Sequence, residues 1–138
     1  MFDSGGVRVT AIPVLHGTWR EAFGYGIDTP DRSIVISGDT RPASSIERAA
    51  AGVDMLIHEV HPASAVAPPN QSAADWGRCL REFHTSDIEL GELVATAKPK
   101  MLVLYHFGAH GVADAEVIAD IRAYKFSDAT HLERPTNR

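Results

Sequence analysis

The stretch Ser33-Ile34-Val35-Ile36-Ser37-Gly38-Asp39-Thr40 indicates how this chain folds and where its chemistry lies. Its apolar, β-branched residues predict a strand that is covered on both faces. Gly38 then opens a turn that brings the carboxylate of Asp39 to the end of the strand. A carboxylate in that position is able to bind a metal ion, so the stretch predicts one edge of a functional site.

Two other predicted strands end in the same way. The run from Val7 to Leu15 leads into His16-Gly17, and the run from Met101 to Tyr105 leads into His106. Imidazole and carboxylate groups are common ligands of zinc. We therefore expect His16, Asp39 and His106 to form half of a metallohydrolase site. The sequence has no His-x-His-x-Asp-His cluster that would complete a two-metal centre.

The remaining pattern indicates one α/β domain over residues 1–138. Strands and helices alternate in a βαβ order, which predicts a twisted mixed sheet with helices packed on one face. The segment 61–70 is rich in proline and alanine and predicts a mobile loop. The expected elements after Thr40 are a helix to about Ala51, a strand from Met55 to Val60, helices from about Gln71 to Glu82 and from Asp87 to before Pro99, a helix to about Tyr124, and an edge strand from Ala129 to Leu132.

Composition narrows the function classes. The chain has 138 residues, 44% of them hydrophobic, which suits one core of modest size. The net charge of −5 argues against a stable complex with nucleic acid, although nucleic acid as a substrate stays open. Cys79 is the single cysteine, so no internal disulfide forms, and we expect it to be an ordinary helix residue. The absence of a long apolar run or a signal-like start predicts a cytoplasmic protein without a membrane span.

Further polar residues follow the strand from Met55 to Val60. Functional groups of open α/β sheets collect beyond the carboxyl ends of the strands, so we expect His58 and Glu59 at the same edge as the three predicted ligands. For each histidine taken singly, a structural role is the alternative. His61 lies in the proline-rich loop and is expected to be solvated. Trp19 and Trp76 are too isolated to stack nucleic-acid bases, which favours hydrophobic contacts for both.

Several short segments follow one another in an order and spacing typical of a known family. On these segments the chain resembles the metallo-β-lactamase superfamily, and within it the ribonuclease Z and arylsulfatase-like branch. The matching segments are Val14-Leu15-His16-Gly17, Ala22-Phe23-Gly24-Tyr25, Ile36-Ser37-Gly38-Asp39-Thr40, Leu56-Ile57-His58-Glu59-Val60, His84-Thr85-Ser86 and Leu102-Val103-Leu104-Tyr105-His106-Phe107.

The resemblance implies a role for each matching polar residue. His16 would ligate one zinc ion, Asp39 would bridge two, and His106 would ligate the second. His84 would handle the proton near the leaving group, and Glu59 would orient His84 through a hydrogen bond. The implied activity is metal-dependent hydrolysis of phosphodiester or sulfate ester bonds through a zinc-activated water. His58 is expected to be structural.

The resemblance covers only the C-terminal half of the family's αβ/βα sandwich. In complete enzymes an N-terminal half carries the His-x-His-x-Asp-His motif. We therefore expect the chain to be a fragment, to pair with an N-terminal-half chain, or to form a homodimer through an apolar sheet face. Alone it would hold one zinc weakly, or none. The alternative is a non-catalytic half-domain. A nucleotide-binding module is disfavoured because no glycine-rich phosphate loop follows any strand.

Overall fold

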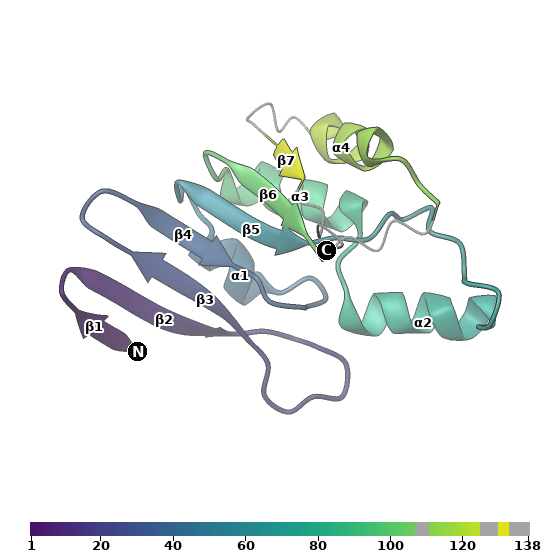
Figure 1. The fold of residues 1–138 in the computed structure, drawn as a ribbon, viewed down its shortest axis with the longest axis horizontal. Helices are drawn as coiled ribbons and strands as arrows, with labels where there is room; N and C mark the ends of the chain where they lie inside the picture. The colour runs from purple at the N-terminus through teal and green to yellow at the C-terminus, as the bar shows by residue number, and fades with distance from the viewer. Residues whose placement is uncertain (107–110, 125–129, 133–138) are drawn as a thin grey trace, which may run out of the picture.

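The protein forms one seven-stranded sheet flanked by four helices, as the computed structural model shows for residues 1–106, 111–124 and the backbone of 130–132 (Figure 1). The strands are β1 (Phe2–Ser4), β2 (Val7–Pro13), β3 (Phe23–Asp28), β4 (Ser33–Ile36), β5 (Met55–Glu59), β6 (Leu102–Tyr105) and β7 (Thr130–Leu132). The helices are α1 (Ser44–Ala49), α2 (Ala73–Phe83), α3 (Asp87–Ala97) and α4 (Asp114–Ala123).

The sheet is mixed, as the sequence predicted. The strands lie side by side in chain order, with antiparallel pairing from β1 to β4 and parallel pairing from β4 to β7. Two successive antiparallel pairings give β2 the same direction as β4. The carboxyl ends of β2, β4, β5 and β6 therefore lie along one edge of the sheet, which we call the carboxyl edge.

The N-terminal hairpin is the element that the sequence pattern did not predict. β1 pairs with β2 through a turn in which Gly5 and Gly6 both have positive φ, +59° and +79°. Two consecutive residues with positive φ suit a tight hairpin, and glycine adopts a positive φ without steric cost. The predicted strand from Val7 to Leu15 ends earlier, at Pro13. After it, Leu15 forms an isolated bridge with Arg41.

Local sequence signals fix the helix ends. The side chain of Ser86 accepts from the backbone N–H of Glu89, and the Glu89 carboxylate accepts from the backbone N–H of Ser86, which is a capping box. Lys98 ends α3 in the left-handed region at φ 52°, directly before Pro99. The side chain of Ser72 caps the start of α2 by accepting a hydrogen bond from the backbone N–H of Asp75. α2 contains no buried residue and lies beyond the end of the sheet (Figure 1).

The hydrophobic core lies between one face of the sheet and the helices α1, α3 and α4. Figure 1 shows α1 and α3 behind the sheet, with α4 against the side of α3. Burial of these apolar side chains is the main favourable contribution to folding. The fully buried members of this core are Ile46, Ala50, Leu56, Val60, Leu90, Val94, Leu102, Leu104, Val117 and Ile121.

The opposite face of the sheet is apolar, and no helix among the described residues covers it. Strand pairing aligns Tyr25, Ile36, Ile57 and Val103 in one row across four strands, and alternation places them opposite the core residues. All four keep partial exposure, and 47% of Tyr25 is accessible. We call this row the open face. The helices therefore cover a single face, which confirms the predicted arrangement.

The segment 61–70 has no regular helix or strand, and its start is tied to α3. His61 donates its backbone N–H to Thr85 and accepts from the backbone N–H of Asp87. The Asp87 carboxylate also accepts from the backbone N–H of Ala63 at 3.0 Å. The mobility of this loop stays a prediction. Among the described residues, the helices are all too short or too polar to cross a bilayer.

Candidate active site

The predicted site residues come from the ends of four strands at the carboxyl edge and from the end of α2. His16 follows β2, Asp39 follows β4, Glu59 ends β5 and His106 follows β6. His84 follows the last turn of α2, which lies over the same edge. The structure thus gathers residues that are up to 90 positions apart in the sequence, because parallel strands end together.

Backbone conformation directs two of these side chains. Gly38 has a φ of +65°, and a Cβ atom there would lie 2.7 Å from the carbonyl oxygen of Phe23. Only glycine fits this turn, which places the next residue, Asp39, at the edge. His106 itself adopts a φ of +46°, which is uncommon for a residue with a side chain. Such conformations are concentrated at functional sites.

His16 is held in one orientation. Its Nδ1 lies 3.0 Å from the carbonyl oxygen of Phe83. A carbonyl only accepts, so Nδ1 donates, and Nε2 is the nitrogen left to bind a metal ion. The Phe83 ring packs edge-on against the imidazole with centroids 5.0 Å apart. Metal-ligating histidines commonly have their other nitrogen fixed in this way.

Asp39 and His106 form the closest pair of predicted ligands. Nε2 of His106 lies 3.6 Å from Oδ2 of Asp39. Their side chains are 54% and 38% exposed, so both remain accessible to a ligand. The His84 ring stands between the other two imidazoles, with centroids 5.6 Å from His16 and 5.7 Å from His106. His84 therefore lies next to His16 on one side and to His106 on the other.

Glu59 is the buried acid beneath this cluster. Its side chain is 1% exposed, and Oε2 lies 3.2 Å from Nδ1 of His84. Oε1 accepts from the backbone N–H groups of Thr40, at 3.0 Å, and Thr85, at 3.2 Å. The hydrogen bond from Glu59 raises the pKa of His84 above its ordinary value, although partial burial opposes this rise. Glu59 therefore favours a protonated His84.

Two threonines that sequence reasoning missed join the loops. Thr40 donates through Oγ1 to the carbonyl of Arg41 at 2.6 Å and accepts from the backbone N–H of Leu15 at 3.2 Å. Thr85 donates to the carbonyl of Thr40 at 2.6 Å. Both threonines are fully buried. Their only sequence signal is adjacency, since each directly follows a candidate residue, Asp39 or His84.

His58 does not reach the site at this edge, and its burial fits the expectation that it is structural. Alternation along β5 points His58 and Glu59 to opposite faces of the sheet, and His58 is buried on the helix side. Its Nδ1 lies 2.7 Å from the carbonyl of Glu59, and its Nε2 has no hydrogen-bond partner among the described residues. Burial lowers the pKa of His58, which therefore stays neutral.

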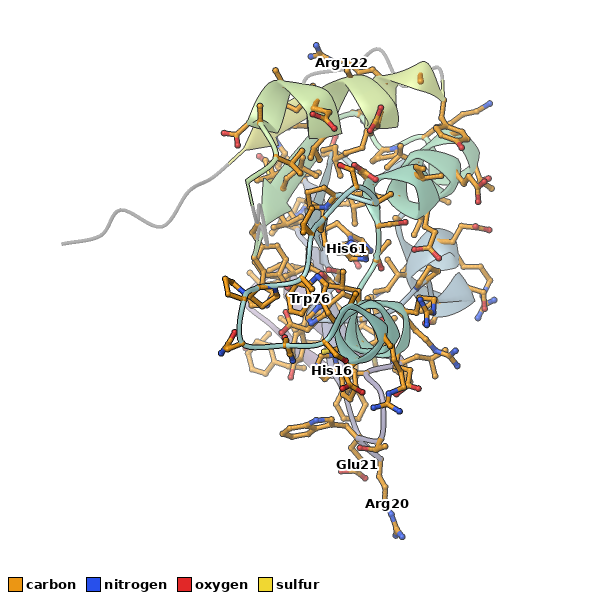
Figure 2. All side chains as sticks on the ribbon, turned by 90° about the vertical axis from the view of Figure 1, so that its right-hand side faces the viewer. His16, Arg20, Glu21, His61, Trp76 and Arg122 are labelled. Carbon is orange, nitrogen blue, oxygen red and sulfur yellow. The ribbon has the colours of Figure 1, made fainter. Side chains whose placement is uncertain are left out.

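His61 also differs from the expectation. It is 8% exposed rather than solvated, because its backbone pairs with the start of α3. Its Nδ1 lies 3.0 Å from the carbonyl of Pro62. Figure 2 shows the labelled positions of His61 and of Trp76, which belongs to α2. Both residues line a cavity that His84 and His106 also line.

The donor types suit zinc, but the described part of the chain does not form a complete metal site. Two imidazoles and a carboxylate lie along one edge, and one imidazole is already oriented. Within residues 1–106 and 111–124, however, no three His, Cys, Asp or Glu side chains converge closely enough to hold an ion. The residues thus fit part of a zinc centre and would need further donors.

A family comparison gives this geometry its context. The sequence profile described as "Beta-lactamase superfamily domain" matches residues 1–107. The chain belongs to this superfamily. Within it, the chain is 30% identical over 139 aligned positions to ribonuclease Z of Mycobacterium tuberculosis (strain H37Rv), covering 99% of this chain and 50% of that protein. This relative supports the predicted ribonuclease Z branch.

Solved structures of the superfamily share the fold. The metallo-beta-lactamase fold protein YhfI from Bacillus subtilis matches with a TM-score of 0.71 at 16% identity, covering 96% of this chain and 49% of that one. Human tRNase Z, short form, matches with a TM-score of 0.56 at 24% identity, covering 78% of this chain and 38% of that one. The chain thus spans half the length of these three relatives, or less.

Proposed function

We propose that this chain supplies one half of the active site of a zinc-dependent hydrolase that cleaves phosphodiester bonds, as in ribonuclease Z. The observation that carries the proposal is the shared edge at which Asp39, His106 and the Glu59–His84 pair meet. Packing alone does not explain why three partly exposed imidazoles gather with a carboxylate at one edge of the sheet. The ribonuclease Z relative supports the same reaction class.

His16, Asp39 and His106 would hold the metal. Zinc bound at such a site supplies an activated water and polarises a phosphoryl oxygen. The protein's own contribution is orientation: the Phe83 carbonyl fixes the His16 ring, and Gly38 fixes the backbone before Asp39. Asp39 and His106 already lie within 3.6 Å of each other, so little movement is needed between them.

His84 would act as the general acid. Its Nδ1 donates to buried Glu59, which keeps the imidazole protonated to a higher pH and leaves Nε2–H free to donate to a leaving oxygen. Its position between His16 and His106 puts that proton next to the predicted metal ligands. Glu59 is a positioning residue because it acts through His84.

The remaining donors would come from a second αβ half that carries the His-x-His-x-Asp-His motif. We propose that this half, in the same polypeptide or in a separate one, packs its sheet on the open face. The row of Tyr25, Ile36, Ile57 and Val103 is apolar over four strands, and such a face favours burial. A homodimer through the same face is the competing arrangement.

A non-catalytic half-domain is the second candidate. The finding that favours it is the lack of three converging donors in the described part of the chain. In that case the chain would fold and associate without turning over substrate, whatever metal is supplied.

Hydrolysis of bis-p-nitrophenyl phosphate separates the two candidates. The assay compares the chain alone with the chain mixed with the motif-carrying half, and p-nitrophenyl sulfate tests the sulfate ester alternative. We expect zinc-dependent release of nitrophenolate only from the mixture, and its loss in Asp39→Ala. Asp3→Ala is the matched control, because Asp3 pairs with Arg8 on the exposed first hairpin. No turnover in the mixture would support the non-catalytic half-domain.

A further inference from the structure

A cavity of about 120 Å³ lies between α2 and the segment that follows β5. Its walls are formed by Val60, Trp76, Cys79 and Leu80, and its polar lining by Glu59, His61, His84 and His106. The function proposed above uses His84 and His106 but assigns nothing to the rest of the cavity. α2, which contributes three of the wall residues, packs into no part of the core.

The polar groups deep in this cavity are already engaged. The Glu59 carboxylate accepts three hydrogen bonds, and Nδ1 of His61 bonds to the Pro62 carbonyl. The remaining wall presents the indole of Trp76, the Leu80 side chain and the Cys79 thiol. A ligand that enters between them therefore meets mainly carbon and sulfur surface, which favours an apolar planar group.

The cavity size limits that group to one ring. An engineered protein cavity of roughly 150 Å³ binds benzene, so about 120 Å³ is the scale of a single six-membered ring. A purine base or a longer acyl chain would not be enclosed. The Trp76 indole offers such a ring a stacking or edge-on partner.

One end of the cavity opens at the reacting groups. His84 and His106 belong to its lining, and His106 is 3.6 Å from Asp39. A ring seated against Trp76 and Leu80 would therefore place the ester that it carries beside His84. We propose that this cavity binds a single aryl group of the substrate, next to the bond that is cleaved. The position of the bond rests on the function proposed above, whereas binding of the ring does not.

Reactivity of Cys79 tests ring binding without any turnover. Cys79 is the single cysteine of the chain and lines the cavity, so a bound ring should shield its thiol from alkylation. The probes are phenylphosphonate and methylphosphonate, which share an anion, resist hydrolysis and differ in the ring. With a chelator present, phenylphosphonate at about ten times its dissociation constant should slow alkylation about tenfold by mass action. Methylphosphonate should leave the rate unchanged.

A variant that fills the cavity gives a second measurement. Cys79→Phe should weaken phenylphosphonate binding about tenfold or more. Binding is measured by the fluorescence of Trp76 in a Trp19→Phe background. Ala74→Phe, on the exposed side of the same helix, is the matched control and should bind as the parent does. Circular dichroism checks that both variants fold, which we expect because α2 has no buried residue.

Three results would overturn the proposal. The first is that methylphosphonate protects Cys79 from alkylation as well as phenylphosphonate does, and the second is that Cys79→Phe binds phenylphosphonate as the parent does. The third is that uridine monophosphate protects Cys79 better than phenylphosphonate does, which would assign the cavity to a pyrimidine. Protection by phenylphosphonate without zinc-dependent hydrolysis would instead overturn the proposed function and leave the aryl site standing.

Discussion

Oε2 of Glu59 lies 3.2 Å from Nδ1 of His84, and the same carboxylate binds the backbone of Thr40 and Thr85 through Oε1. One buried acid thus raises the pKa of the candidate proton donor, His84, and binds the backbone at Thr40 and at Thr85. Because its side chain is 1% exposed, solvent screens this interaction little.

Replacing Glu59 by glutamine should lower the pKa of His84 toward the ordinary histidine value. The amide keeps one acceptor but loses the negative charge that raises the pKa. The measurement is an NMR titration of the His84 ring protons. Glu21→Gln is the control, since Glu21 lies exposed at a loop tip (Figure 2). An unshifted titration in Glu59→Gln would show that the carboxylate does not govern His84.

The same pair should make stability depend on pH. A histidine whose pKa is raised on folding stabilises the fold fully below its unfolded pKa, near 6.5. That contribution disappears as the pH rises through the higher folded value. We therefore expect the urea midpoint of the parent chain to decrease as the pH rises from about 6.5 through the higher pKa of the folded state. The fall should be smaller in His84→Gln, and an equal fall would assign the effect to other groups.

Gly38→Ala should destabilise the fold and disturb the placement of Asp39. Gly52 offers a matched control, because it has a similar φ, +67°, but nothing within 4 Å of a Cβ atom. Gly52→Ala should lower the free energy of unfolding by about 1 kcal/mol, because alanine must adopt the left-handed conformation. Gly38→Ala adds a contact of 2.7 Å with the backbone and should lower the free energy of unfolding by about 2 kcal/mol more. Equal urea midpoints for the two variants would contradict the steric argument.

Charge on the open face should prevent its association. Tyr25→Lys places an ammonium at the β3 end of the apolar row, where burial against a second sheet would be costly. We expect it to abolish pairing with the motif-carrying half, or self-association, in sedimentation velocity. Trp19→Lys is the control, since Trp19 is 68% exposed on the β2–β3 loop, outside the face. Unchanged association in Tyr25→Lys would place the interface elsewhere.

Much of the fold could be predicted because its signals are local. The β-branched run before Gly38 marks β4, and the Ser86 to Glu89 capping box with Pro99 marks α3. The edge position of Asp39 and His106 followed from strand ends alone. The family segments supplied the role of Glu59, whose bond to His84 the structure confirms.

The rest depends on contacts that no local pattern encodes. The three-residue strand β1 exists through its pairing with β2. His61 is buried because its backbone pairs with Ser86, which lies 25 positions away. The cavity beside Trp76 forms where α2 approaches the end of β5, and neither element indicates this alone.

Measuring the bound zinc is the sharpest check on the proposal that His16, Asp39 and His106 form one half of a metal site. Elemental analysis would compare the chain mixed with the motif-carrying half to the same mixture made with Asp39→Ala. We expect two zinc ions per pair with the parent chain, and at most one weakly held ion with Asp39→Ala. An unchanged zinc content in Asp39→Ala would contradict it.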